Sequence, residues 1–402
     1  MADNLRALFQ LDPQVCFLNH GSYGACPLAV FETYQGWQAR LERQPVAFMN
    51  PRHLATLFAD VGAALGGALG ADPDDLVAVT NATAGLNIVA RSLPLAPGDE
   101  ILTTDHEYAA LDKTWAFVAR RTGAVIRTVT VPLPLTSVEA FTEALVAAIT
   151  PRTKVLFLSH ITSPTALLFP IERAIAAARA RGIWTVVDGA HAPGQIPLNL
   201  NALGADFYAG NCHKWMMAPK GSAFLFARPE MQGLLEPALI SHGWTEEGTT
   251  PGPFGGSAFQ DAFQFQGTRD HAAFLSIPAA LEFARVQGWQ GVADRCRIMA
   301  QETAERLRGL IGLPALSSPE FCAPQMVSVR LPDGTANLRD AFLDRYGIEI
   351  PFPIWRGQSH LRLSVQGYNV QAEMDQLHAA VAVELRPGGW LAPPPDGPLR
   401  QA

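Results

Sequence analysis

Residues 183–226 read IWTVVDGAHAPGQIPLNLNALGADFYAGNCHKWMMAPKGSAFLF. The stretch opens with an apolar or β-branched run, Ile183–Val187, which is typical of a strand buried on both faces of a parallel sheet. This run ends in Asp188, and a second short strand, Asp206–Ala209, is followed by Lys214. Open α/β sheets bind their ligands at the carboxyl ends of their strands. The stretch therefore predicts a carboxylate and an amine at the same edge of one sheet.

An amine and a carboxylate at this edge can together bind a cofactor. Burial lowers the pKa of an amine, which suits Lys214 to attack a carbonyl carbon and later to carry a proton. A buried Asp188 is costly unless a cation lies against it. A protonated pyridine nitrogen meets that need, and the lysine can be attached covalently to a substituent of the same ring. The pattern thus favours a pyridine cofactor.

The same residues carry a family resemblance. Asp188–His191 (DGAH), followed by Lys214 in the segment Asn211–Trp215 (NCHKW), 26 residues after Asp188 (214 minus 188), resembles class V aminotransferases. The chain most resembles their isopenicillin N epimerase-like branch. The resemblance implies an α/β fold of the pyridoxal phosphate (PLP)-dependent fold type I. It also implies a large domain with a seven-stranded, mostly parallel sheet and a smaller C-terminal α+β domain.

The resemblance, together with the strand–helix pattern, implies the following organisation. An N-terminal arm that lines the substrate site is expected over residues 1–28, and a large PLP-binding domain over 29–270. A small α+β domain spans 271–386, and a Pro-rich tail, expected to be disordered, spans 387–402. In the small domain, strands are expected at Gln325–Leu331, Ile348–Pro353 and His360–Val365, and helices at Asn337–Tyr346 and Gln371–Leu385.

Composition narrows the partners. With 30 Lys and Arg against 37 Asp and Glu, the net charge of -7 gives no basic field for nucleic acid. The start, MADNLRALFQLDPQ, lacks the apolar core of a signal peptide, and no apolar run is long enough to span a bilayer, so a cytoplasmic protein without a membrane partner is expected. The 5 cysteines are scattered without metal-type spacing, which predicts reduced thiols and no metal site.

A cradle for the cofactor phosphate is expected where a strand at Leu76–Thr80 passes into a helix through Asn81, Ala82 and Thr83. Backbone N–H groups at a helix start bind anions. The resemblance implies that Ala82 and Thr83 hold the phosphate together with His213. It further implies that Thr268 reaches the phosphate of the opposite subunit, so a homodimer with shared active sites is expected.

The residues around the cofactor ring are also expected from the resemblance. Asp188 would keep the ring nitrogen protonated. His106 occupies the position of a stacking histidine in related cysteine desulfurases, and Tyr108 is the alternative within the same tetrad. Relatives commonly have an asparagine at the phenolic oxygen, where this chain offers Thr162 or Ser163. His191 is a second donor for that oxygen.

The substrate end of the pocket combines the arm with the small domain. The segment FLNHGSYGACP, residues 17–27, is rich in turn residues, and the resemblance implies that Asn19, Gly21 and Ser22 contact the substrate. Arg362, in LRLSVQGYN, matches the arginine that binds the substrate α-carboxylate in this family. The planar donor fork of arginine suits a carboxylate.

These assignments predict an enzyme that acts at the α-carbon of an amino acid or a peptide-like substrate. Lys214 would abstract the α-proton while Asp188 keeps the ring nitrogen protonated. The candidates for a second catalytic acid or base are His106, Tyr23 and Tyr108. An epimerase or racemase is favoured. The alternatives are a carbon–sulfur β-lyase of the ergothioneine-pathway type acting on a cysteine derivative, and then an aminotransferase.

Three further observations bear on the choice. Cysteine desulfurases carry a nucleophilic cysteine shortly before the arginine, and Ile348–His360 contains none, which disfavours persulfide chemistry. A Rossmann-type nucleotide-binding module is disfavoured because no Gly-x-Gly-x-x-Gly follows the early strands. A catalytically silent PLP-binding protein is the non-enzyme alternative, against which the presence of Lys214, Asp188 and Arg362 argues.

Overall fold

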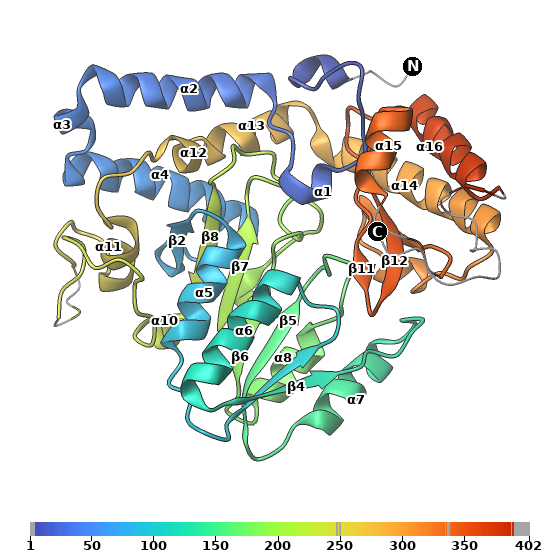
Figure 1. Ribbon diagram of the computed structural model, residues 1–402. Helices are drawn as coiled ribbons and strands as arrows, with labels where there is room; N and C mark the ends of the chain where they lie inside the picture. The colour runs from blue at the N-terminus through green and yellow to red at the C-terminus, as the bar shows by residue number, and fades with distance from the viewer. Residues whose placement is uncertain are drawn as a thin grey trace.

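The computed structural model describes residues 5–246, 248, 251–333, 335, 338–386 and 388–389. Its centre is a seven-stranded sheet of order β2-β8-β7-β6-β5-β3-β4 (Figure 1). β8 is antiparallel to both of its neighbours, and all other pairs are parallel. The strands are β2 (Leu76–Val79), β3 (Glu100–Thr104), β4 (Val125–Val129), β5 (Thr153–Ser159), β6 (Trp184–Asp188), β7 (Phe207–Asn211) and β8 (Ala223–Ala227). The predicted seven-stranded, mostly parallel sheet is confirmed.

The sheet is buried on both faces because its strands are apolar at successive positions. In β5, Leu156 and Leu158 enter one hydrophobic core, whereas Val155 and Phe157 enter the core on the opposite face. The first core is closed by α4 (Pro51–Leu69), α7 (Val138–Ala148), α8 (Glu172–Arg179) and α13 (Ile277–Val286). The second is closed by α5 (Ala82–Ser92), α6 (Ala109–Thr122) and α11 (Ala258–Gln264).

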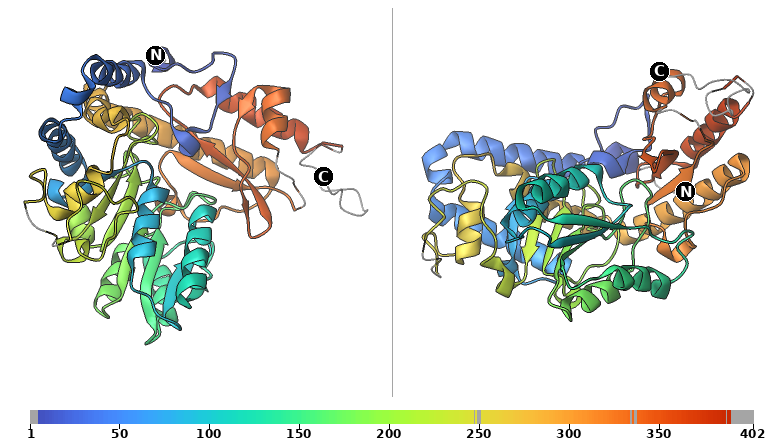
Figure 2. Two further views of the ribbon diagram at one scale, coloured as in Figure 1. Left: turned by 60° about the vertical axis from the view of Figure 1, so that its left-hand side comes forward. Right: turned by 60° about the horizontal axis from the view of Figure 1, so that its bottom comes forward.

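The N-terminal segment extends across the molecule to the C-terminal part (Figures 1 and 2). Its elements are β1 (Cys16–Phe17), α1 (His20–Tyr23), α2 (Leu28–Arg43) and α3 (Pro45–Phe48). The short helix α12 (Ala272–Leu275) comes much later in the chain. β1 pairs in parallel with β10 (Ile348–Glu349), and Leu18 contributes to the core of the C-terminal part. A strand pair and shared core packing therefore join the N-terminal segment to the C-terminal part.

The C-terminal part has a three-stranded antiparallel sheet of order β11-β12-β9. Its elements are α14 (Trp289–Ile311), β9 (Met326–Arg330), α15 (Arg339–Tyr346), β10 (Ile348–Glu349), β11 (Ile354–Trp355), β12 (Gln358–Ser364) and α16 (Gln371–Glu384). The single strand predicted at Ile348–Pro353 is wrong, because β10 ends at Glu349 and a separate β11 begins at Ile354. Pro351 and Pro353 lack the N–H group that a continuous ladder requires.

Two predicted segments lie partly outside the described residues. A helix was expected to start at Asn337, which is not among the described residues, and the structure begins this helix at Arg339. Residues 387 and 390–402 of the expected tail also lie outside the described residues. Within the described part of the chain, no helix is both long and apolar enough to cross a bilayer. The division at residues 28, 270 and 386 stays a prediction.

Candidate active site

Asp188 and Lys214 follow from two adjacent parallel strands. Asp188 is the last residue of β6 and is paired in register with Ala209 of β7, and Lys214 lies three residues beyond the end of β7 (214 minus 211). Burial lowers the pKa of Lys214, and the charge of Arg362 lowers it further, while Asp188 opposes both. Lys214 is therefore more nucleophilic near neutral pH than an ordinary lysine.

His191 contacts the lysine directly. Its Nε2 atom lies 3.2 Å from Lys214 Nζ, and the indole N–H of Trp215 donates to its Nδ1 atom over 3.4 Å. Because Nδ1 accepts, the proton of the neutral ring is on Nε2. Burial lowers the pKa of His191, and the charge of Lys214 adds to this effect. The arrangement presents an N–H donor to the neutral amine.

Asp188 has an oxygen available for a cationic partner. Its Oδ1 accepts the N–H of Ala190 over 2.9 Å, and this is the one hydrogen bond of the Asp188 side chain among the described residues. Burial raises the pKa of Asp188, against the hydrogen bond from Ala190 and the charge of Lys214. A buried carboxylate with a free oxygen fits a protonated pyridine nitrogen. The next residue must be Gly189, since a Cβ there would lie 1.9 Å from Tyr208 Cε1.

The expected phosphate cradle lies at the start of a helix. Helix α5 begins at Ala82, and Asn81 caps it by accepting the N–H of Ala84 over 2.8 Å. The N–H of Ala82 is already used, because it donates to Asn211 Oδ1 over 2.8 Å. Among the described residues this leaves the N–H and hydroxyl of Thr83 as the donors without a partner at this helix start. The Ala82 N–H thus has a partner within the chain, and the place of Ala82 in the cradle stays a prediction.

The other two predicted phosphate residues lie in different settings. His213 is nearly buried, and its Nδ1 donates to the carbonyl of Ser222 over 3.0 Å. Burial lowers the pKa of His213 to about 4. Thr268 is exposed in the bend between α11 and α12. Its reach to another subunit stays a prediction.

His106 and Tyr108 differ in their surroundings. His106 is 0% exposed, with Nδ1 at 2.8 Å from Thr165 Oγ1 and its ring 4.3 Å from the ring of Trp355. Tyr108 is 44% exposed. Burial lowers the pKa of Arg362 to about 10, and the nearby Tyr108 opposes this shift. The stacking and catalytic roles of His106, and the alternative of Tyr108, stay predictions.

Ser163 serves Arg362 rather than an open site. Arg362 Nη1 donates to the carbonyl of Ser163 over 2.6 Å and to its hydroxyl over 3.1 Å, and Nη2 donates to Ser22 Oγ over 3.2 Å. Arg362 Nε is buried and has no partner among the described residues. The N–H of Nε and one N–H of Nη2 thus have no partner among the described residues, and two neighbouring donors of a guanidinium suit a carboxylate. Ser163 thus supports Arg362, and its expected contact with the cofactor stays a prediction.

The predicted arm residues surround Arg362. Ser22 contacts Arg362 and also donates to Asn19 Oδ1. The N–H of Gly21 donates to Ser364 Oγ, on the same strand as Arg362, over 3.2 Å. The structure therefore brings Asn19, Gly21 and Ser22 to Arg362, whereas their contact with a substrate stays a prediction.

Sequence reasoning left several residues of the site without a role. Asn211 and Trp215 stand in the motif around Lys214, so their proximity was visible but their contacts were not. His20 lies in the segment 17–27, and its contact with Lys214 joins residues 194 positions apart. Trp355 belongs to the strand that was not predicted. No local pattern indicates such long-range contacts.

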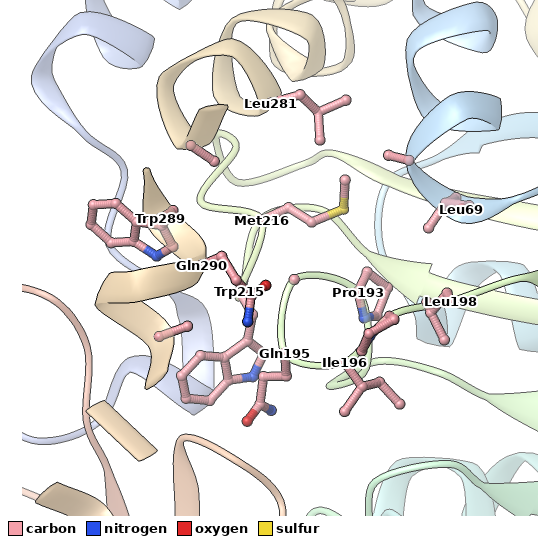
Figure 3. A pocket seen from close by; sticks show the side chains of 15 residues that line it. Leu69, Pro193, Gln195, Ile196, Leu198, Trp215, Met216, Leu281, Trp289 and Gln290 are labelled. Carbon is pink, nitrogen blue, oxygen red and sulfur yellow. The ribbon is translucent and has the colours of Figure 1, made fainter. Parts of the chain in front are cut away.

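A separate cavity of about 330 Å³ is lined by Trp215 and Met216, the two residues that follow Lys214 (Figure 3). Trp215 and Met216 form one wall, and Leu69, Leu281 and Trp289 contribute to the others. None of the predicted site residues lines this cavity. Trp215 thus lines this cavity and also donates to His191 of the site.

Comparison with curated proteins gives two epimerases of high similarity. The chain is 39% identical over 388 residues to isopenicillin N epimerase of Amycolatopsis lactamdurans, covering 94% of this chain and 97% of the relative. It is 38% identical to isopenicillin N epimerase of Streptomyces clavuligerus, with the same coverage. A probable chloroplastic L-cysteine desulfhydrase of Arabidopsis thaliana is 27% identical, over 94% of this chain and 84% of that protein.

Solved structures show the same fold. A mutant of C-DES with glycine covalently linked to its PLP cofactor has a TM-score of 0.76 at 24% identity, covering 94% of this chain and 98% of that chain. The cysteine desulfurase CsdA of Escherichia coli has a TM-score of 0.75 at 24% identity, covering 96% of this chain and 99% of that chain. The fold type I architecture is therefore confirmed.

The profile of the family described as Aminotransferase class-V matches residues 31–377, which is most of the chain. The family resemblance inferred from the motifs is confirmed, and the free oxygen of Asp188 and the free donors of Arg362 fit PLP and a carboxylate substrate. The chain belongs to the class-V aminotransferase family of PLP-dependent enzymes.

Proposed function

We propose that this protein is a PLP-dependent epimerase that inverts the α-carbon of an amino acid or a peptide-like substrate. The proposal rests on the 39% identity to an isopenicillin N epimerase over nearly the full length of both chains, against 27% for the desulfhydrase. The hairpin before Arg362 supports it, because the segment from Ile348 to His360 contains no cysteine that could carry a persulfide.

We assign separate roles in substrate and cofactor binding to the residues of the site. Arg362 would bind the substrate carboxylate through Nε and Nη2, since its other N–H groups are taken by Ser163 and Ser22. Thr83 and His213 would hold the cofactor phosphate. When bound, PLP withdraws electrons from the α-carbon and weakens its C–H bond. Asp188 would hold a proton on the ring nitrogen, which strengthens that withdrawal.

Inversion requires two groups that transfer protons. Lys214 is suited to remove the α-proton because burial lowers its pKa and His191 donates to the neutral amine. Tyr108 is the candidate for returning a proton from the other side, since its side chain is 44% exposed and its hydroxyl can carry a proton. Burial lowers the pKa of Arg362 to about 10 and the nearby Tyr108 opposes this shift, so Tyr108 lies near the group that would bind the substrate carboxylate.

A product assay tests the epimerase proposal. The protein is incubated in deuterated water with a panel of L-amino acids, peptides that carry a free α-amino acid end, and S-substituted cysteines. We expect α-deuterium in the substrate and formation of the D-isomer with PLP retained. Pyruvate from cysteine derivatives would replace the proposal with a β-lyase, and pyridoxamine phosphate would replace it with an aminotransferase. Lys214→Ala is the control that should abolish each product.

We further propose that the enzyme is a cytoplasmic homodimer in which Thr268 completes the phosphate site of the other subunit. Exposed apolar side chains support an interface, because Leu239 is 59%, Ile240 62% and Trp244 42% exposed. Mixing two inactive variants, Lys214→Ala and Thr268→Lys, tests shared sites. One intact site per mixed dimer should restore part of the activity. Absence of recovery in a dimer shown by light scattering to have exchanged subunits would exclude shared sites.

A further inference from the structure

The short helix α1 of the N-terminal arm contacts both halves of the proposed site. From this helix, Gly21 and Ser22 contact β12 and Arg362, as described above. On the other side, His20 Nε2 lies 3.0 Å from the carbonyl oxygen of Lys214. Three consecutive residues thus connect the backbone of Lys214 to the strand that carries Arg362. Figures 1 and 2 show α1 between the large sheet and the C-terminal sheet.

The hydrogen bonds of His20 fix its orientation and tautomer. A carbonyl oxygen can only accept, so the proton of His20 lies on Nε2 and is donated to Lys214. The Nδ1 atom lies 2.9 Å from the hydroxyl of Tyr368, which therefore donates to it. The His20 ring is 0% exposed and lies 4.9 Å from the ring of Trp215. Both nitrogens and one side of the ring are thus occupied.

The charge state of His20 agrees with this tautomer. Burial lowers the pKa of His20 to about 3, and the charges of Lys220 and Lys214 lower it further, while the Lys214 carbonyl opposes them. The ring is therefore neutral wherever the protein is expected to work. Its role is to donate a fixed hydrogen bond and not to transfer protons.

The exit of the helix adds a second constraint on the same backbone. Gly24 has a φ of 70°, which favours glycine. A Cβ at this position would lie 2.1 Å from the carbonyl oxygen of His213 and 3.0 Å from Lys214 Cα. The arm thus packs against the main chain of the lysine loop at two points, His20 and Gly24. The main chain at His213 and Lys214 therefore cannot shift toward the arm without a clash.

We propose that His20 is a positioning residue that fixes the main chain of Lys214 and, through α1, its spacing from Arg362. This inference rests on the proposed roles of Lys214 and Arg362. Both the amine and the carboxylate-binding group act on one substrate, so an error of about 1 Å in their spacing can cost on the order of 100-fold in rate. The hydrogen bond from Tyr368 would keep the ring of His20 in the required tautomer.

Two measurements test this role without a known substrate. The first is hydrogen–deuterium exchange of the segment 211–218 in the protein free of PLP. The second is the rate of PLP attachment, followed by the visible absorbance band and fixed on the lysine by borohydride reduction. The variants are His20→Ala, His20→Gln, whose amide N–H can reach the same carbonyl, and Tyr368→Phe. Leu18→Ala is the matched control, since Leu18 is equally buried in the arm but contacts the C-terminal core.

We expect His20→Ala to increase exchange in 211–218 and to slow PLP attachment by about 10- to 100-fold, with His20→Gln recovering most of both and Tyr368→Phe in between. Leu18→Ala should lower thermal stability without either change. If His20→Ala and Leu18→Ala behave alike, His20 is only structural and the inference is wrong. If the wild-type protein attaches no PLP, or attaches it at another lysine, the proposed roles fail instead. These two failures are therefore distinguishable.

Discussion

The Nε2 atom of His191 lies 3.2 Å from Nζ of Lys214, and the indole N–H of Trp215 holds the opposite side of the imidazole. This contact lowers the free energy of the neutral amine relative to the ammonium, because a ring N–H can donate only to an amine that has a free lone pair. The lysine is therefore prepared to react before any cofactor arrives.

Replacing His191 tests this preparation. We expect His191→Phe to raise the pKa of Lys214, so that PLP attaches more slowly at pH 7 while the rates converge at high pH. The measurement is the pH dependence of the attachment rate, followed by visible absorbance. His271→Phe is the control, since His271 is a buried histidine that packs against Phe58. Parallel pH profiles for wild type and His191→Phe would contradict the assignment.

The free donors of Arg362 predict a specific loss of carboxylate recognition. The Arg362→Lys variant keeps the charge but replaces the fork with a single ammonium group. We expect it to weaken the binding of L-alanine by about 10- to 100-fold, the scale of hydrogen bonds to charged groups, and to leave the binding of ethylamine unchanged. Spectral titration of the PLP-loaded protein measures both constants.

The Ser163→Ala variant tests whether Ser163 only supports Arg362, which would itself bind the substrate carboxylate. The carbonyl of Ser163 still accepts from Nη1 in this variant, and only the 3.1 Å contact with the hydroxyl is lost. We therefore expect Ser163→Ala to weaken the binding of L-alanine less than Arg362→Lys does. If Arg362→Lys weakened the binding of ethylamine as much as that of L-alanine, Arg362 would not recognise the carboxylate.

The sequence was sufficient for residues whose role depends on the end of a strand. Asp188 and Lys214 were placed correctly because an apolar run fixes where its strand ends, and neighbouring parallel strands end at one edge. Arg362 was recognised as one position in a motif, but the support of its Nη1 comes from Ser163, 199 residues away. The cover of His106 was not predictable for the same reason, because Trp355 comes from a different sheet.

Tyr108 and His106 can be separated by matched variants. Tyr108→Phe keeps an aromatic ring and loses the hydroxyl, so we expect PLP binding and α-deuterium exchange to persist while formation of the D-isomer falls by about 100-fold or more, the scale of one general acid. His106→Phe should leave the visible band in place and lower thermal stability, since His106 packs on Trp355 and contacts Thr165. A shifted visible band in His106→Phe together with full D-isomer formation in Tyr108→Phe would reverse the two assignments.

Glu107 is a second buried acid beside the site. The hydroxyls of Thr104 and Ser159 each donate to one of its carboxyl oxygens over 2.6 Å, and Ser159 pairs in register with Asp188 on the adjacent strand. Burial raises the pKa of Glu107 to about 8, the two hydroxyl donors lower it, and the charges of Asp188 and Asp112 raise it. Glu107 is therefore protonated in the folded protein at neutral pH.

This protonation predicts how stability depends on pH. An unfolded glutamic acid loses its proton near pH 4.5, so between that pH and about 8 the folded state binds more protons than the unfolded state. The free energy of unfolding must then fall as pH rises through this window and level off above it.

The Glu107→Gln variant keeps the shape of the side chain and removes its titration. The variant should therefore match the stability of the wild type near pH 5 and exceed it by on the order of a few kcal/mol at pH 8. Urea unfolding of the PLP-free protein at both values measures the difference. A constant difference between Glu107→Gln and wild type across the window would exclude Glu107 as the titrating group.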